Sequence, residues 1–362
     1  MILTLISLFT SALTCFLIIH LNFLHKITSD PVGKGPQKFH KKPVPRIGGL
    51  GIALGLFASW LFLKLKGDSF SKEFFLFLIS AIPAFSGGIL EDLTKSGRIK
   101  IRLFLTLLSA GMGAFLLDSL ITRIDVPFID FFLKLFPISF AFTVFAVSGI
   151  CHAINIIDGF NGLSGMVSLI ILTSLGYVSY LTGDSFLLSL CLSAGGAIIG
   201  FLVWNYPYGL IFLGDGGAYL LGFLIAEISV LLVNKHPEVS AWFPMMLCVY
   251  PVTETLFSIY RKKFLRKMSP ALPDGLHFHM LIYKRIVKQG IKEELKQNFM
   301  TSPYLWTITL ISNLFAVFFW KRTSFLVYSV ISFILFYVWL YGRIVHFKTP
   351  KLLKYLQKTK VP

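Results

Sequence analysis

The chain has 362 residues, of which 55% are hydrophobic and 14% are charged, and its formal net charge is +17. Soluble domains contain about 25% charged residues, so this composition excludes an ordinary soluble enzyme and indicates a chain surrounded by lipid. No nucleic-acid-binding motif accompanies the excess of Lys and Arg, so we expect no nucleic-acid partner. The positive charge is instead attributed to membrane orientation and to attraction toward anionic lipid headgroups.

Eleven segments are apolar and close to the length that crosses a bilayer, which takes about 20 residues. Their apolar runs are continuous and lack the alternation of β-barrel strands, so the expected fold is all-α, in one integral membrane domain over residues 1–362. The first segment has no Lys or Arg before Lys26, which favours a helix over a secretory signal. The expected helices are 2–25, 47–66, 73–90, 101–121, 133–152, 162–182, 185–203, 214–233, 240–260, 303–320 and 323–343.

The distribution of Lys and Arg orients these helices, because cytoplasmic connections carry an excess of both residues. If the N-terminus is periplasmic, 26 of the 34 Lys and Arg lie on the cytoplasmic side and eight on the other. The predicted cytoplasmic connections are 26–46, 91–102, 153–161, 204–213 and 261–302, followed by the tail from residue 343. We therefore expect a multi-pass protein of the bacterial inner membrane with its active face in the cytoplasm.

Acids, amides, basic residues and histidines gather on this cytoplasmic face, although hydropathy and Lys/Arg counts alone set the topology. Carboxylates beside glycine turns suit Mg²⁺, which proteins hold through one or two carboxylates together with substrate phosphates. Basic and imidazole groups suit the remaining phosphate charge, so the group predicts phosphoryl transfer. Neither a P-loop nor a kinase signature is present. The candidate residues are Glu91, Asp92, Lys100, Asn155, Asp158, Asn161, Asn205, Asp215, His277, His279 and Arg285.

Four motifs occur in this order on that face: "EDLTKSGRIKIR", "NIIDGFNGLSG", "WNYPYGLIFLGDGGAYLLG" and "PDGLHFHMLIYKR". Together they resemble the bacterial polyprenyl-phosphate N-acetylhexosamine-1-phosphate transferases, relatives of the MurNAc-pentapeptide translocase. The resemblance runs from about residue 46 to residue 285. It implies transfer of a sugar 1-phosphate from a UDP-N-acetylhexosamine to undecaprenyl phosphate, with release of UMP and with Mg²⁺, or Mn²⁺ in its place. Such a reaction starts the synthesis of O-antigen, capsule or another cell-envelope polysaccharide.

The resemblance also implies roles for the acids and for one lysine. Asp215 is the expected Mg²⁺ ligand, supported by Asp92. Glu91 and Asp92 match the acidic pair that is credited with activating the lipid phosphate, and Lys100 matches a cation near the acceptor. Asp158, in the nucleotide-facing loop, is an expected catalytic residue. The pair is commonly Asp-Asp in the family, whereas here it is Glu-Asp.

The expected substrate-binding residues come from two loops and a connecting segment. In the nucleotide-facing loop an amide, Asn161, replaces the second carboxylate of the family pattern D-G-x-D-G-L. In the histidine loop, residues 273–285, Met280 stands where many members have a further His, which argues against the MurNAc-pentapeptide branch. The complete expected set is Asn155, Asn161, Asn205, His277, His279 and Arg285.

Other interpretations stay open at this point. Glu254 lies in the inner half of the expected helix 240–260, where it could pair with Arg261 or serve the site. The alternative function is a secondary transporter of an anionic metabolite, although such sites lie at the bilayer midplane and often within inverted repeats. A structural scaffold would leave the motifs unexplained. The sequence leaves open which UDP-sugar is used and whether the protein forms a homodimer.

Overall fold

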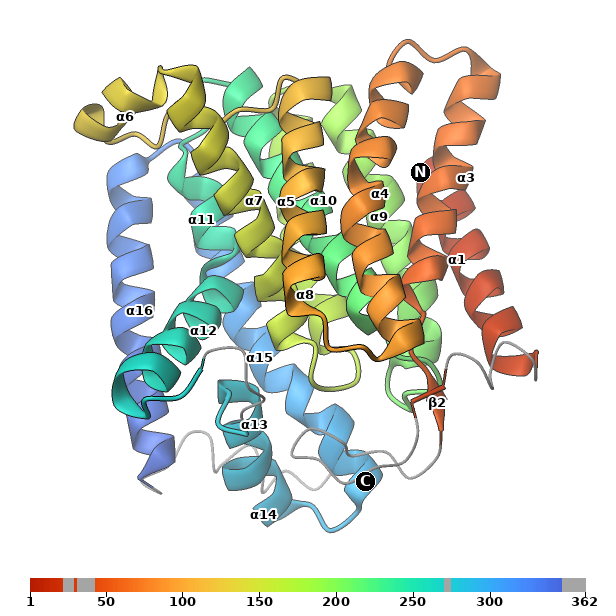
Figure 1. The fold of residues 1–362 in the computed structure, drawn as a ribbon, viewed down its shortest axis with the longest axis vertical. Helices are drawn as coiled ribbons and strands as arrows, with labels where there is room; N and C mark the ends of the chain where they lie inside the picture. Colours follow the sequence, from red (N-terminus) through yellow and green to blue (C-terminus); the bar gives the residue numbers. More distant parts are fainter. Residues whose placement is uncertain (22–28, 31–42, 270–274, 347–362) are drawn as a thin grey trace.

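The computed structural model of the protein describes residues 1–21, 29–30, 43–269 and 275–346. Helices make up most of this chain (Figure 1), and two strands of two residues, β1 (Ser29–Asp30) and β2 (Val44–Pro45), pair antiparallel. The helices are α1 (Ile2–His20), α3 (Gly49–Lys66), α4 (Ser71–Thr94), α5 (Ile99–Leu116), α6 (Pro127–Leu133), α7 (Phe136–Ile157), α8 (Leu163–Leu181), α9 (Ser185–Asn205), α10 (Gly214–Lys235), α11 (Trp242–Leu247), α12 (Val249–Tyr260), α13 (Phe278–Ile282), α14 (Lys288–Gly290), α15 (Glu294–Phe318) and α16 (Thr323–Val345), with π-helical turns at Arg261–Leu265 and Tyr283–Val287.

Nine helices of the described chain are long and apolar enough to cross a membrane. They are α1, α3, α4, α5, α7, α8, α9, α10 and α16. This confirms the prediction of an all-α polytopic membrane protein. The two further predicted spans correspond to α11 with α12 and to α15.

The expected span at 240–260 is divided at Cys248 into α11 and α12. Pro251 has no amide hydrogen to donate to the carbonyl of Leu247, so the helical hydrogen bonding is interrupted there. The side chain of Asn313 in α15 donates to the Leu247 carbonyl at 3.1 Å. A neighbouring helix therefore satisfies the backbone group that the proline leaves open, as burial away from water requires.

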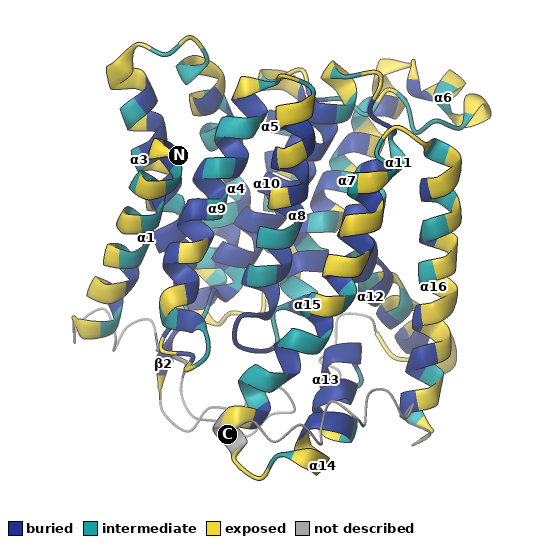
Figure 2. Ribbon diagram, turned by 180° about the vertical axis from the view of Figure 1, so that it is seen from behind, coloured by how far each residue is buried: buried dark blue, intermediate teal, exposed yellow. Residues whose placement is uncertain are grey.

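Helix α10 lies at the core of the bundle, since 89% of the residues in its most apolar stretch are buried inside the protein (Figure 2). Glycines let α4 and α3 approach its first turn closely. A Cβ at Gly88 of α4 would lie 2.2 Å from the amide nitrogen of Gly216, and one at Gly49 of α3 would lie 2.4 Å from that of Gly217. Small residues of this kind permit helix backbones to touch, and here they bring α3 and α4 against the start of α10.

The segment after β2 is fixed against the chain that leads into α10. Phe212 donates its backbone amide to the carbonyl of Pro45 at 2.8 Å, and Gly48 donates its own to the carbonyl of Phe212 at 2.9 Å. This pairing brings Arg46 to the first residues of α10. In Figure 1, β2, α13 and α14 lie at the lower end of the bundle and α6 lies at the upper end.

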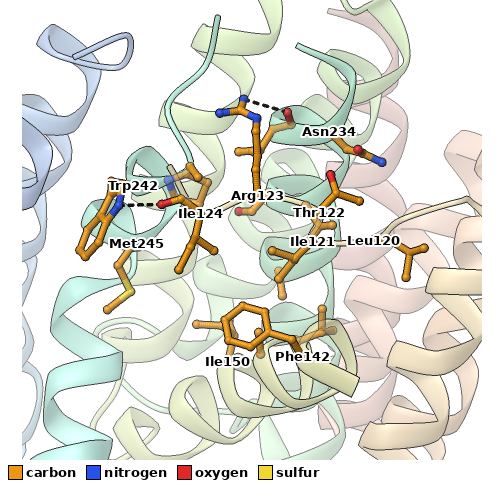
Figure 3. Close-up of a pocket in the computed structure, with 18 of the residues that line it drawn as sticks. Leu120, Ile121, Thr122, Arg123, Ile124, Phe142, Ile150, Asn234, Trp242 and Met245 are labelled. Carbon is orange, nitrogen blue, oxygen red and sulfur yellow. Dashed lines mark hydrogen bonds between the residues drawn. The ribbon is translucent and has the colours of Figure 1, made fainter. Parts of the chain in front are cut away.

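An apolar cavity of about 310 Å³ lies at the end of the bundle that is opposite to β2, between α7, α10 and α11 (Figure 3). Phe142 and Ile150 of α7 and Met245 of α11 are part of its wall. At its rim, Arg123 donates to the carboxylate of Asp125 at 2.5 Å and to the carbonyl of Val239 at 2.7 Å. The lining contains none of the candidate residues, so the cavity and the polar site are separate places in the molecule.

Candidate active site

Asp215, in the first turn of α10, is the residue around which charged and amide groups from three other parts of the chain converge. Its carboxylate accepts hydrogen bonds from Arg102 at 2.5 Å, from the side-chain amide of Asn155 at 3.1 Å and from Arg46 at 3.4 Å. Arg102 comes from α5, Asn155 from the end of α7, and Arg46 from the segment after β2. We call these four residues the Asp215 cluster. The Asp215 side chain is 13% exposed, so its carboxylate is partly accessible.

Asp92 holds the first turn of α10 in place from the end of α4. One carboxylate oxygen accepts the backbone amide of Asp215 and the other accepts that of Gly216, both at 3.0 Å. The first amide groups of a helix have no partner within the helix, and a negative charge beside them is stabilising. Arg46 lies 3.7 Å from the same carboxylate. Asp92 therefore acts on Asp215 through the backbone, while its predicted catalytic and metal roles stay predictions.

The two other predicted groups of this stretch lie apart from the Asp215 cluster. Glu91 accepts the backbone amide of Gly97 at 2.9 Å and the hydroxyl of Ser96 at 3.3 Å, and so closes the turn between α4 and α5. Lys100 is exposed. The cation next to Asp215 is Arg102, which the sequence analysis did not name, and the predicted role of Lys100 near the acceptor stays a prediction. Residues two apart on a helix point to different faces, so only one of this pair could face α10.

Asp158 begins the loop that joins α7 to α8 and lies near the Asp215 cluster. Burial raises the pKa of its carboxyl to about 6, against the hydrogen bond from Ser164 and the positive charge of Arg46, which lower it. The negative charge of Asp215 acts with the burial. The group therefore changes charge close to neutral pH, as a residue with an acid–base function would require.

Asn161 and Asn205 fasten this loop to the connection between α9 and α10. Asn205 accepts the backbone amide of Gly162 at 2.6 Å and donates to the carbonyl of Ile211 at 2.7 Å. Asn161 donates to the carbonyl of Pro207 at 2.9 Å. Both side chains are buried, so the structure gives them positions in the scaffold of the loops, and their predicted contact with substrate stays a prediction.

The histidine loop contacts the 158–160 segment through His279. His277 shares a hydrogen bond with Glu254 of α12 at 2.8 Å, and its ring is stacked on that of His279 with 5.3 Å between centroids. A Cβ at Gly159 would lie 2.8 Å from Nε2 of His279, so this glycine leaves room for the imidazole. Arg285 is half-buried in the π-helical turn after α13. Glu254 thus hydrogen-bonds to His277 of the histidine loop, and its role in the site stays a prediction.

The two histidines differ in their electrostatic surroundings. Burial and the neighbouring His277 lower the pKa of His279 to about 3, and the opposite effect of Glu254 is smaller. His279 is therefore neutral near pH 7 and can act as a hydrogen-bonding group without a charge. Its Nδ1 is buried without a hydrogen-bond partner among the described residues, and such an atom needs a ligand or water to satisfy it.

The donor set around Asp215 fits Mg²⁺ when substrate phosphates complete the coordination. Within the described chain no three residues among the His, Cys, Asp and Glu form a ready metal cage. Mg²⁺ is commonly held by one or two carboxylates plus phosphate oxygens, so the partly accessible carboxylate of Asp215 is compatible with a metal role, which stays a prediction. The side-chain oxygen of Asn155 is a further candidate ligand, because the side-chain nitrogen is the atom that donates to Asp215.

The sequence profile described as glycosyl transferase family 4 matches residues 74–233. The chain is 29% identical over 251 residues to a probable undecaprenyl-phosphate N-acetylglucosaminyl 1-phosphate transferase of Bacillus subtilis (strain 168), covering 67% of this chain and 66% of that protein. It is 30% identical over 252 residues to an undecaprenyl-phosphate alpha-N-acetylglucosaminyl 1-phosphate transferase of Thermotoga maritima, covering 70% and 72%. It is 28% identical over 208 residues to a phospho-N-acetylmuramoyl-pentapeptide-transferase of Clostridium perfringens (strain 13 / Type A), covering 55% and 65%. The chain thus spans about two thirds of the length of these relatives.

Proposed function

The chain belongs to glycosyl transferase family 4, and from this premise we propose that it transfers a sugar 1-phosphate from a UDP-N-acetylhexosamine to undecaprenyl phosphate. The observation that carries the proposal is the convergence of Arg46, Arg102 and Asn155 on Asp215 at the start of the buried helix α10. Three groups that bind phosphate oxygens well surround one carboxylate there. The site thereby combines cations for two phosphorylated substrates with a ligand for a metal ion.

The proposed reaction is an in-line displacement at phosphorus. An oxygen of the lipid phosphate forms a bond to the phosphorus that carries the sugar, and the bond between that phosphorus and the bridging oxygen of the diphosphate breaks. UMP leaves with the bridging oxygen, and the sugar 1-phosphate remains on the lipid. Positioning and neutralisation of charge supply most of the catalysis in such transfers.

We assign a different role in this reaction to each charged residue at the start of α10. Arg46 and Arg102, which are held on Asp215 before substrate arrives, offer guanidinium groups to the phosphate oxygens. Asp215 would hold Mg²⁺, which neutralises the charge of the diphosphate when it is bound. Asp92 holds the first turn of α10 in position by accepting the backbone amides of Asp215 and Gly216.

The loops place the donor in this proposal. The imidazole of His279 lies beside the 158–160 segment, with that of His277 stacked on it, where both can meet the sugar diphosphate. Asp158, whose carboxyl has a pKa of about 6, can accept a hydrogen bond from the nucleotide or a proton during the transfer. Met280, which follows His279, supports an N-acetylhexosamine donor over a MurNAc-pentapeptide donor.

We propose that the site faces the cytoplasm of a bacterium, with eleven crossings and a periplasmic N-terminus. The 26 Lys and Arg assigned to the cytoplasmic side support this orientation. UDP-sugars are available on that side, and the acceptor reaches the site from the inner membrane. The lipid-linked product would start a cell-envelope polysaccharide.

The proposal is tested with the purified chain in detergent or nanodiscs, undecaprenyl phosphate, Mg²⁺ and a panel of UDP-N-acetylhexosamines. UMP should appear together with a lipid-linked sugar diphosphate, and both should require the acceptor. Arg102→Gln is the matched inactive control, because it removes the shortest contact of Asp215. Absence of UMP with every donor overturns the proposed function.

A further inference from the structure

Glu254 is a completely buried acid of α12, and its partners come from two other elements of the chain. One oxygen shares a hydrogen bond with Nδ1 of His277 at 2.8 Å, and both oxygens lie within reach of the backbone amide of Phe278, at 3.2 and 3.1 Å. The hydroxyl of Tyr337 in α16 donates to the second oxygen at 2.6 Å. A buried carboxylate is stabilised only when it is bonded in this way. Glu254 therefore joins the last membrane helix to the histidine loop.

A second contact from α16 fixes the same loop one residue before His277. The hydroxyl of Tyr341 donates to the carbonyl of Leu276 at 2.9 Å, and Arg261 donates to that hydroxyl at 2.9 Å. Tyr337 and Tyr341 lie one helical turn apart, so both hydroxyls reach the loop from one face of α16. Residues 276 and 277 of the histidine loop are thus held, the first at its backbone and the second at its imidazole.

The donors around Glu254 determine the protonation of the imidazole. A carboxylate has acceptor oxygens only, and the other two partners of Glu254, an amide and a hydroxyl, are donors. Nδ1 of His277 must then carry the hydrogen. Nε2 is left as the ring nitrogen that is open to another group. The same relationship, a carboxylate behind an imidazole, orients histidines that bind metals or act in catalysis.

The orientation of His279 depends on that of His277. The two rings are parallel to within 3° and stacked, and the rings of His279 and Phe160 are in an edge contact with 5.8 Å between their centroids. A rotation of His277 would remove one wall of the space that holds His279. Glu254 therefore affects both histidines, although it contacts only the first.

We propose that Glu254 and Tyr337 are positioning residues of the active site, which fix the tautomer of His277 and present its Nε2 to the diphosphate of the donor. This inference rests on the proposed function. It assigns a role in the site to α16, which lies outside the segment that matches the family profile. Tyr337 acts through Glu254, and Glu254 acts through His277, so neither needs to touch substrate.

The principal test is Glu254→Gln in the full chain, with KM measured separately for the UDP-sugar and for the lipid acceptor. A glutamine can donate to Nδ1 of His277, which moves the ring hydrogen to Nε2. We expect the KM for the donor to rise by about tenfold or more, as for other residues that orient a functional histidine, while the KM for the acceptor is unchanged. Glu254→Asp should restore part of the affinity for the donor, and Tyr337→Phe should give a smaller change of the same kind.

Matched controls separate positioning from general loss of structure. Glu227→Gln changes another completely buried acid, which lies in α10, and it should leave both KM values unchanged. Tyr328→Phe removes an exposed hydroxyl from the same helix as Tyr337 and should also be silent. Equal changes in both KM values, or a fall in kcat alone, in Glu254→Gln and Tyr337→Phe would overturn the inference.

A second measurement does not depend on turnover. The ¹⁵N chemical shifts of the His277 ring in the unliganded protein report which nitrogen carries the hydrogen. We expect hydrogen on Nδ1 in the wild type and on Nε2 in Glu254→Gln. The same tautomer in both proteins would refute the role of Glu254, whereas failure of the wild type to release UMP would refute the proposed function alone.

Discussion

Asp92 and Asp215 are joined by a hydrogen bond that runs from the backbone amide of Asp215 to the carboxylate of Asp92, at 3.0 Å. Asp92 thereby fixes the backbone position of Asp215. The side chain of Asp92 is completely buried, whereas that of Asp215 is 13% exposed. Replacement of the first should therefore disturb structure and activity together, and replacement of the second should disturb activity alone.

We expect Asp92→Asn to lower both turnover and thermal stability. Asparagine offers one acceptor oxygen in place of two, so the amide of Asp215 or that of Gly216 loses its partner. Loss of a capping interaction at a helix N-terminus costs about 0.5–2 kcal/mol. Turnover and the unfolding temperature in detergent are measured side by side. Glu91→Gln, which affects the turn at Gly97, should retain more activity than Asp92→Asn.

We expect turnover to require a metal ion that is bound by Asp215. Asp215→Asn keeps the shape of the side chain and removes the charge that would hold Mg²⁺, so turnover should fall by about 10²-fold or more with the unfolding temperature little changed. In the wild type, EDTA should abolish release of UMP, and Mg²⁺ or Mn²⁺ should restore it. Full activity in EDTA would contradict the metal role.

Arg102 should matter far more for turnover than Lys100, because Arg102 contacts Asp215 and the Lys100 side chain is exposed. Arg102→Gln removes the cation that lies 2.5 Å from Asp215 and should lower turnover by about 10²-fold. Lys100→Gln changes an exposed side chain and should stay within about twofold of the wild type. A larger loss at Lys100 would show that the acceptor phosphate binds farther from Asp215 than the cluster indicates.

Nine of the eleven predicted membrane helices could be recognised from the sequence, because a long apolar segment is visible in composition alone. The structure also brings Asn155 and Asp215 of two separate motifs into contact. The break between α11 and α12 could not be predicted with its cause, because the partner of the Leu247 carbonyl is Asn313, 66 residues away in the chain.

The choice between neighbouring cations was also beyond the sequence. Lys100 and Arg102 begin the same helix, and the rotation of α5 against α10 decides which of them reaches Asp215. Likewise, the sequence left open whether Glu254 pairs with Arg261 or serves the site. Its contacts with His277 and Phe278 depend on how the histidine loop packs on α12. Pairings of this kind depend on long-range packing, which one sequence does not state.

Gly88 and Gly149 offer a matched pair for testing the approach of α4 to α10. Gly88→Ala would place a methyl group 2.2 Å from the amide nitrogen of Gly216, whereas nothing lies within 4 Å of a Cβ at Gly149. Overpacking costs about 1–3 kcal/mol, and displacement of α10 would separate Asp215 from Asp92. We expect Gly88→Ala to lose thermal stability and turnover, and Gly149→Ala to keep both. Equal stability of the two variants would contradict the close approach.

The pH dependence of turnover should report the carboxyl of Asp158. Burial raises its pKa to about 6, and the hydroxyl of Ser164 and the charge of Arg46 hold it from rising further. Below that pH the group is protonated and neutral, and above it the group is ionised. If the ionised carboxylate serves the reaction, turnover rises as pH passes through about 6. Asp158→Asn should lower turnover at pH 8 and remove this step from the profile.

Ser164→Ala gives the sharper form of this experiment, because it leaves the carboxylate in place. Without the hydroxyl, one interaction that stabilises the ionised form is lost, so the pKa of Asp158 rises. The acidic limb of the profile should then shift to higher pH, while turnover at alkaline pH stays close to that of the wild type. Ser174→Ala, which removes a hydroxyl of α8 that donates to the Ile170 carbonyl, is the control and should not shift the limb. A shift to lower pH in Ser164→Ala, or none, would mean that another group governs the acidic limb.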